Sequence, residues 1–391
     1  MKHLDHNPTQ SFNDEDSNTS NNPAFDQILD TRLSRRSLFR GAGLAGVAAG
    51  ATAMTGCATS MIGGGTTMTS LGFKPVAKSI ADKVSVPEGY SAQIIYALGD
   101  PLTASTPAFK NDGTDAAFDQ RAGDHHDGME WFGLDASSQP SDSFTARGIL
   151  AVNHEATTDE RGKRASFFIH ANGGTATLPR PSGETDKELA IHGLSFVEVQ
   201  ADGKRWAYQP SSPFNRRITA STPATIHGAA RGSEQMITKF SADGTQCRGT
   251  LNNCGTGKTP WGTFVSGEEN WFGYFSRDAK DDEARKKDKQ VQGLNRYGRK
   301  AGAASRHGWE SAGPQDQYVR WNNSVIAASA KDDYRNEMNT FGYVVELDAY
   351  DAAAPMRKRT GLGRFAHESV SFAQPVAGLP IVAYMGDDAR G

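Results

Sequence analysis

The chain has 391 residues, a formal net charge of −3 and 37% hydrophobic residues, so it can bury a large core as one big domain or two ordinary ones. Its 42 glycines and 17 prolines make it turn-rich, with no basic patch for nucleic acid and no apolar run of membrane-spanning length. Three cysteines are too few for a disulfide scaffold.

The N-terminal part has its own organisation. Residues 1–33 are polar, rich in Asn, Asp and Ser and poor in aromatic side chains, which predicts a disordered region. Residues 34–57 contain Arg35 and Arg36, two apolar residues and a Gly/Ala-rich run, the pattern of a signal for the twin-arginine translocation machinery. An ordinary surface helix is disfavoured by the glycines. The mature protein is expected to be periplasmic or secreted, or a lipoprotein if "MTGC" is lipidated at Cys57.

A linker over residues 58–83 leads into a region of short apolar runs bounded by turns, so residues 84–391 are predicted as one all-β domain. Asp-Gly turns in "VQADGKRW" and "FSADGTQCRGTL" predict hairpins. The size and the repeated hairpins favour a β-propeller over a sandwich. Strands are expected within residues 90–98, 146–155, 193–209, 263–270, 341–349 and 379–388.

Two stretches interrupt the strands. Residues 276–300 are almost wholly charged and polar, which predicts a solvated insertion without chemistry, and residues 169–188 are predicted as another exposed loop. The stretch "GTGKT" is rejected as a phosphate loop, because the position of the first glycine is taken by Asn252.

Cys254, in "LNNCGTGKTPWGTFVSGEEN", has several open roles. An isolated cysteine is most often a small buried hydrophobe, and pairing with Cys247 would close a short hairpin loop. The neighbouring amides, the glycine turn and the pair Glu268–Glu269 form a polar setting that a core does not favour. A thiolate needs a positive partner, and a metal ion is a good one.

Further polar clusters follow predicted strands. Each alone is weak, since strand-end Asn, Asp and Glu are usually turn residues, but propeller strand ends can converge on one funnel. Hard oxygen ligands suit calcium, a mixed carboxylate–thiolate shell suits iron, and paired arginines suit a phosphate. The candidate metal ligands are Asn153, Glu155, Cys254, Glu268, Glu269, Glu368, Asp387 and Asp388, and the candidate catalytic arginines are Arg216, Arg217 and Arg364.

The sequence resembles the PhoX family of secreted, metal-dependent alkaline phosphatases from Val86 nearly to its end. The stretch from Cys254 to Asn270 is the most specific, and "GILAVNHEATTDE", "FNRRITASTPATIHGAA" and "VAYMGDDAR" support it in the family's order. The resemblance implies a propeller, six-bladed in the full-length family, with iron and calcium at its centre. It implies that Cys254 is an iron ligand, that the "NHE", "EEN", "HES" and "GDD" carboxylates surround the metals, and that phosphomonoesters are hydrolysed.

Some residues depart from the family pattern. Gly267 stands where a cysteine is expected, and Ala366 and Ser369 stand where Lys and Gly are commoner, which puts a cationic substrate contact there in doubt. Neighbouring residues of a strand point to opposite faces, so only one of Glu268 and Glu269 is expected to be a ligand.

The expected function is an extracytoplasmic, monomeric alkaline phosphatase that acts on small phosphomonoesters. The alternatives are a calcium-only propeller hydrolase of the phytase or lactonase type, and a non-catalytic binding propeller. The final strand-like stretch leaves the next sheet edge unpaired. It therefore predicts an incomplete propeller that lacks one to three blades of about 40–50 residues, part of the metal cluster and the activity.

Overall fold

The computed structural model describes residues 74–389, apart from 144, 156–165, 176, 204 and 287. The predicted disordered region and export signal, with Arg35, Arg36 and Cys57, lie outside the described residues. The chain divides into two units, residues 1–90 and 91–391. In the first unit, the described residues 74–90 form neither helix nor strand. No helix among the described residues is both long and apolar enough to cross a membrane.

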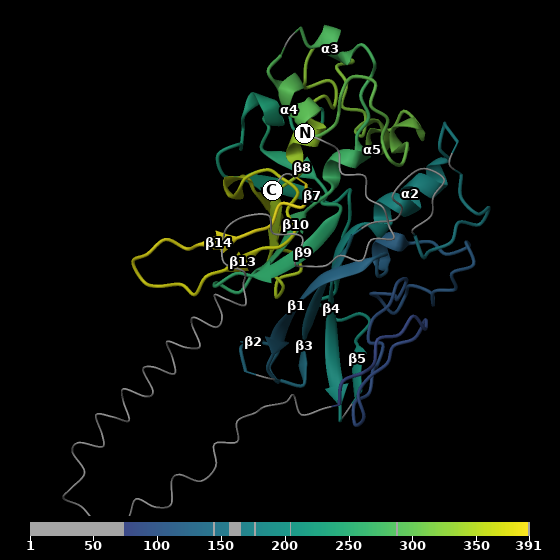
Figure 1. Ribbon diagram of the computed structural model, residues 1–391, viewed down its shortest axis with the longest axis vertical. Coiled ribbons are helices and arrows are strands. Elements are labelled where there is room, and N and C mark those ends of the chain that lie inside the picture. Colours follow the sequence, from purple (N-terminus) through teal and green to yellow (C-terminus); the bar gives the residue numbers. More distant parts are fainter. Residues whose placement is uncertain are drawn as a thin grey trace, which may run out of the picture. The chain divides into compact units, whose positions relative to one another are not determined.

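The second unit contains a six-stranded antiparallel sheet in the order β2-β1-β3-β4-β5 (Figure 1). Strand β6 pairs with the start of β4, beside Leu194–Phe196, while β5 pairs with its end, beside Val199–Asp202. The strands are β1 (His126–Leu134), β2 (Pro140–Ser141), β3 (Arg147–His154), β4 (Gly193–Asp202), β5 (Arg205–Tyr208) and β6 (Arg216–Ile218).

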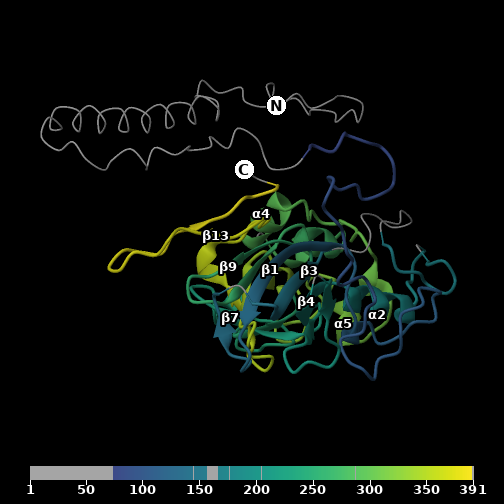
Figure 2. The same cartoon turned by 90° about the horizontal axis from the view of Figure 1, so that it is seen from below.

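A second six-stranded sheet has the order β8-β7-β12-β11-β10-β9, antiparallel except for the parallel pair β7 and β12. Its edge strand β9 lies beside β1 of the first sheet (Figures 1 and 2). The strands are β7 (Pro223–His227), β8 (Gln246–Arg248), β9 (Asn253–Lys258), β10 (Phe264–Glu268), β11 (Val344–Leu347) and β12 (Met356–Arg359), and the short pair β13 (Ser371–Phe372) and β14 (Ala383–Tyr384) stands apart.

The helices are short, and the three between β10 and β11 lie together at one end of the second unit (Figure 1). The α-helices are α2 (Ser182–Ile191), α3 (Asp281–Ala284), α4 (Gln290–Arg296) and α5 (Asp316–Val319). The 3₁₀ turns are η2 (Phe118–Gln120), η3 (Glu234–Met236), η4 (Trp271–Tyr274), η5 (Trp309–Ser311), η6 (Glu337–Thr340) and η7 (Thr360–Leu362). The all-β prediction is therefore confirmed.

The two sheets share one hydrophobic core. Phe264 of β10 packs edge-on against Phe196 of β4, with ring centroids 5.5 Å apart, and against Phe132 of β1 at 6.4 Å. All three side chains are fully buried. A second, aromatic core, which includes Trp309, Trp321 and Phe341, lies under the helices.

Three predicted strands are wrong or much shorter than expected. Residues 90–98 form no strand. The side-chain amide of Gln93 donates to Trp206 O and accepts from Trp206 N of β5, in place of backbone-to-backbone pairing. In the predicted hairpin over residues 240–251, only Gln246–Arg248 is a strand, because the Ser241 hydroxyl accepts the N–H groups of Thr245 and Gln246. Of residues 379–388 only Ala383–Tyr384 pair as a strand, and the predicted loop over residues 169–188 contains the start of α2.

The charged stretch 276–300 is less solvated than predicted. Arg277 and Arg285 both donate to Asp281 Oδ2 at 2.7 Å, and all three side chains are buried. Their spacing of four residues brings both guanidinium groups to the one carboxylate. A run of charged residues does not by itself indicate exposure, since charges buried as hydrogen-bonded pairs have the same sequence pattern.

A second buried ion pair joins two strands of the second sheet. Lys358 Nζ of β12 lies 2.8 Å from Glu268 Oε1 of β10, and neither side chain is exposed. Lys358 also donates to Thr340 O at 2.7 Å, while Glu268 Oε2 accepts the N–H groups of Gly342 and Tyr343. The pair therefore ties β10, β12 and the entry to β11 together.

Replacement of Lys358 by Met should destabilise the chain by about 3–5 kcal/mol, because it leaves the Glu268 carboxylate buried without its counter-charge. Urea unfolding followed by circular dichroism measures the change. The double variant Glu268→Gln/Lys358→Met should recover a large part of the loss, since no buried charge is then unpaired. If the loss of stability in the double variant equals the sum of the losses in Glu268→Gln and Lys358→Met alone, the ion-pair explanation is wrong.

Candidate metal centre

The candidate site begins where the segment 366–370 crosses β9. Cys254 Sγ lies 3.5 Å from Glu368 Oε1, and Val370 N donates to Thr256 O at 3.4 Å. This approach needs glycine at two positions of β9. A Cβ atom on Gly255 would lie 1.7 Å from Glu368 O, and one on Gly257 would lie 1.8 Å from Val370 O. The "GTG" stretch is therefore strand backbone against which another segment packs, which agrees with the rejection of a phosphate loop.

Three side chains that could bind a metal ion meet where the segment 366–370 crosses β9. The thiol of Cys254 and one carboxylate oxygen each from Glu269 and Glu368 lie within 4.8 Å of one another. Glu368 Oε2 is buried and has no hydrogen-bond partner among the described residues. Glu269 is buried and Cys254 half-buried, and negative charges held this close repel one another unless a cation lies between them, so the arrangement fits a metal ion.

Three more carboxylates surround this group. Asp127 of β1 contacts the Cys254 thiol, Asp388 hydrogen-bonds Glu269, and Glu155 at the end of β3 lies near Asp127 and Glu269. Sequence reasoning missed Asp127. The available signal was that it belongs to "HHDGMEWF", a polar group beside an apolar run like the others. We call Asp127, Glu155, Cys254, Glu269, Glu368 and Asp388 the acidic cluster.

Burial and like charges raise the pKa values of Glu155, Cys254 and Glu269 and so favour their protonated forms. The pKa of Glu269 is raised from 4.5 to about 8, first by burial and then by Asp388, Glu368 and Glu155. The pKa of Glu155 is also raised by burial and by Asp127. Burial, followed by Asp127 and Glu269, raises the pKa of the Cys254 thiol. A cation would reverse all these effects, because metal ligands bind in their deprotonated forms.

Two asparagines adjoin the acidic cluster. Asn252, in the left-handed region at φ 51°, donates from Nδ2 to Glu155 Oε1 at 3.1 Å. Its Oδ1 is buried without a partner among the described residues, so it is a further oxygen that a cation could use. Asn153 was predicted as a ligand, but both its polar atoms are occupied: Nδ2 donates to Cys254 O and Oδ1 accepts from Ser266 Oγ. Its observed contacts position the Cys254 backbone.

The two adjacent glutamates separate as the strand geometry predicts. Glu268 points into the core and is fully used by Lys358 and two backbone N–H groups, whereas Glu269 points into the acidic cluster. Because both Glu268 oxygens are occupied by these partners, Glu269 is the better candidate of the two, and Glu268 as a ligand stays a prediction. Asp387 forms a β-bridge with His367 and accepts from Ala389 N, so its role as a ligand stays a prediction.

The three predicted catalytic arginines bind backbone carbonyl groups instead of lining the acidic cluster. Arg216 donates to the carbonyls of residues 348, 352 and 354, and Arg217 to those of residues 121, 190, 192, 194 and 218. Arg364 donates to Phe341 O and Met338 O and stacks on Trp271. Two adjacent arginines resemble an anion-binding pair in the sequence, but here the guanidinium groups donate to backbone carbonyl groups of strands, a helix and loops.

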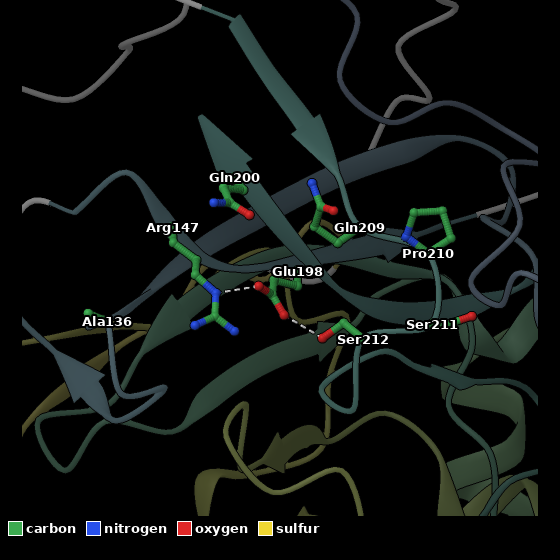
Figure 3. A pocket seen from close by; sticks show the side chains of 8 residues that line it. All are labelled: Ala136, Arg147, Glu198, Gln200, Gln209, Pro210, Ser211 and Ser212. Carbon is green, nitrogen blue, oxygen red and sulfur yellow. Dashed lines mark hydrogen bonds and ion pairs between the residues drawn. The ribbon is translucent and has the colours of Figure 1, made fainter. Parts of the chain in front are cut away.

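A polar hollow of about 460 Å³ lies along the first sheet (Figure 3). At its centre Arg147 Nε lies 2.5 Å from Glu198 Oε1, and Ser212 Oγ donates to Glu198 Oε2 (Figure 3). The charges of Arg147 and Glu198 neutralise each other, and no residue of the acidic cluster lines this hollow. The acidic cluster is therefore the better candidate for the functional site.

Two of three comparisons with known proteins found a match. The family model for alkaline phosphatase PhoX matches residues 71–391. Among solved structures, Pseudomonas fluorescens PhoX in complex with vanadate, a transition state analogue, is 33% identical with a TM-score of 0.67. The match covers 82% of this chain and 49% of that one, so the chain spans about half of that protein. Among curated proteins no relative matches.

The stability of the metal-free chain should fall as pH rises from about 5 to about 8. Glu269 has a higher pKa when folded than its ordinary 4.5, so the folded state holds a proton that the unfolded state releases in this range. Melting temperatures measured after chelation test this. Glu269→Gln should flatten the slope, whereas Asp332→Asn, at an exposed acid, should keep it. A wild-type slope in Glu269→Gln would contradict the assignment.

Gly255→Ala should weaken metal binding at least about tenfold, because the new Cβ displaces Glu368 from Cys254. Calorimetric titration of the chelated protein with Ca²⁺ and Fe²⁺ measures this. Gly293→Ala, in α4 with nothing near its added Cβ, is the control and should leave metal binding unchanged. Equal affinities for both variants would show that the close approach does not set the site.

Proposed function

The chain belongs to the PhoX family of alkaline phosphatases, and from this premise we propose that it hydrolyses phosphomonoesters with the help of metal ions. The observation that carries the proposal is the convergence of Cys254, Glu269 and Glu368. The solved family member was captured with vanadate, which its description calls a transition state analogue. An acidic cluster without cations would repel a phosphate, so metal ions are integral to the proposal.

We propose iron and calcium as the ions. The Cys254 thiolate suits iron, while the carboxylates of Asp127 and Glu155 and the free Asn252 oxygen make an all-oxygen environment that suits calcium. When bound, such ions neutralise phosphate oxygens and lower the pKa of a coordinated water. A calcium-only hydrolase would have no use for a thiol at this position.

The residues of this chain have two tasks in the proposal. The acidic cluster holds the ions, and the second-layer contacts hold the cluster: Asn153 fixes the Cys254 backbone and Asn252 orients Glu155. Because Arg216, Arg217 and Arg364 are engaged with carbonyls, the metal ions carry the neutralisation of the substrate within the described part of the chain. Small phosphomonoesters are the proposed substrates.

We also propose that the protein works outside the cytoplasm after export by the twin-arginine machinery. The support is the sequence of residues 34–57, with Arg35 and Arg36 ahead of an apolar Gly/Ala-rich run. This pathway carries folded proteins, which suits a protein that takes up its metal ions before it crosses.

Cys254→Ala should remove iron and reduce phosphatase activity by more than the roughly 10–100-fold typical of an outer-shell change. Elemental analysis and hydrolysis of p-nitrophenyl phosphate measure the two effects on the same preparation. Cys247→Ala is the matched control, since Cys247 is the other free cysteine among the described residues and is buried in the core. It should keep its iron content.

Two results would count against the proposal. Iron content unchanged by Cys254→Ala would show that the thiol is not a ligand. A fully metal-loaded chain without activity on any phosphomonoester would leave the metal site standing and reject the phosphatase function.

A further inference from the structure

An apolar cleft of about 520 Å³ lies far from the acidic cluster, at the turn end of the β9–β10 hairpin. Its walls include Trp261 from that turn, Leu362 from η7, and Phe372 and Ile381 from the β13–β14 segment. Trp261 is 54% exposed although its ring meets Phe372 edge-on, with centroids 5.9 Å apart. A half-exposed tryptophan in a concave apolar wall is typical of a ligand-binding surface.

One end of the cleft is cationic. Arg359 donates from Nε to Glu346 Oε2 at 2.5 Å, and Glu346 Oε1 is already used by Trp261 Nε1 and Thr263 Oγ1. Among the described residues no partner is found for the two terminal nitrogens of Arg359, whose side chain is 33% exposed. His227 is the register partner of Arg359 on the neighbouring strand.

The charge at this end is positive beyond what Glu346 neutralises. Burial and then the charges of Arg359, Arg357 and Arg231 lower the pKa of His227. The charge of Glu346 acts in the opposite direction and raises the pKa of His227, but it is the smallest of these effects. Arg359 lines the cleft, and the N–H groups of its two terminal nitrogens are available to a ligand.

The cleft is separate from the metal centre. Cys254 stands at the start of β9, while Thr259, which lines the cleft, follows its end. Five residues of extended chain span about 16 Å, so one small ligand cannot occupy both places. In the same way, Val265, which lines the cleft, lies near the start of β10, while Glu269 of the acidic cluster follows its end.

We propose that this cleft binds a single-chain amphipathic carboxylate, with its apolar chain against Trp261 and Phe372 and its head group on Arg359. The cleft volume lies within the roughly 300–1,000 Å³ usual for small-molecule sites. A carboxylate fits because a guanidinium edge offers two parallel N–H groups to one planar anion. Among the described residues that line the cleft, Arg359 is the one arginine or lysine, and Glu346 lies beside it, so a monoanion is favoured over a phosphate dianion.

The test is calorimetric titration of the purified chain with decanoate, decanol and decyltrimethylammonium, each below its micelle concentration. Decanoate should bind one-to-one, and decanol and the cation at least about tenfold more weakly, because they lack the ion pair. Trp261→Ala and Arg359→Gln should each weaken decanoate at least about fivefold. Ile326→Ala, at an exposed apolar residue outside the cleft, should change nothing.

Three outcomes would overturn the proposal. No saturable decanoate binding would reject the site, and equal binding of decanol would reject recognition of the anionic head. Unchanged affinity in Trp261→Ala would place any binding elsewhere. Arg359→Gln leaves Glu346 without its cation and could unfold the chain, so circular dichroism is recorded for each variant and Trp261→Ala decides independently. No arm uses phosphatase activity, so the result does not depend on the proposed function.

Discussion

The mutual repulsion of the acidic cluster is the constraint on which the rest of this structure depends. Five carboxylates and one thiol come from six places in the chain: the start of β1, the end of β3, β9, the end of β10, and the two paired segments around residues 368 and 388. Without a cation this concentration of negative charge is opposed by both Coulomb repulsion and desolvation. The fold therefore supplies rigid support for the arrangement, and in the proposed function a cation supplies the counter-charge.

The support is built from backbone contacts. Gly255 and Gly257 remove the side chains that would keep the segment 366–370 away from β9, and Asn153 ties β3 to the Cys254 carbonyl. On the other face of the same hairpin, the Glu268–Lys358 pair fixes the strand whose next residue is Glu269. The geometry of the acidic cluster and the stability of the core are thus linked, because Glu268 belongs to the core and the next residue, Glu269, belongs to the cluster.

Arginine has an architectural task in this chain. Arg216, Arg217 and Arg364 donate to backbone carbonyl groups of a loop, of α2 and of η6 and so hold these segments in place. A guanidinium group with five donors suits this work as well as it suits phosphate binding. In the proposed function, substrate charge is neutralised by the metal ions, which makes activity strictly dependent on the integrity of the acidic cluster.

The sequence by itself determined the all-β class, most of the central strands, the special setting of Cys254 and the family. These features are local: Val-, Ile- and Phe-rich runs between turns favour strands, and Cys254 stands in a motif of contiguous residues. It also predicted that Glu268 and Glu269 point to opposite faces, because a strand alternates its side chains. Only the tertiary structure decided that Glu269 is the cluster residue, that Asp127 joins it, and that the three arginines do not. Those outcomes depend on which distant carbonyl, lysine or thiol lies opposite each side chain, and no local pattern encodes that.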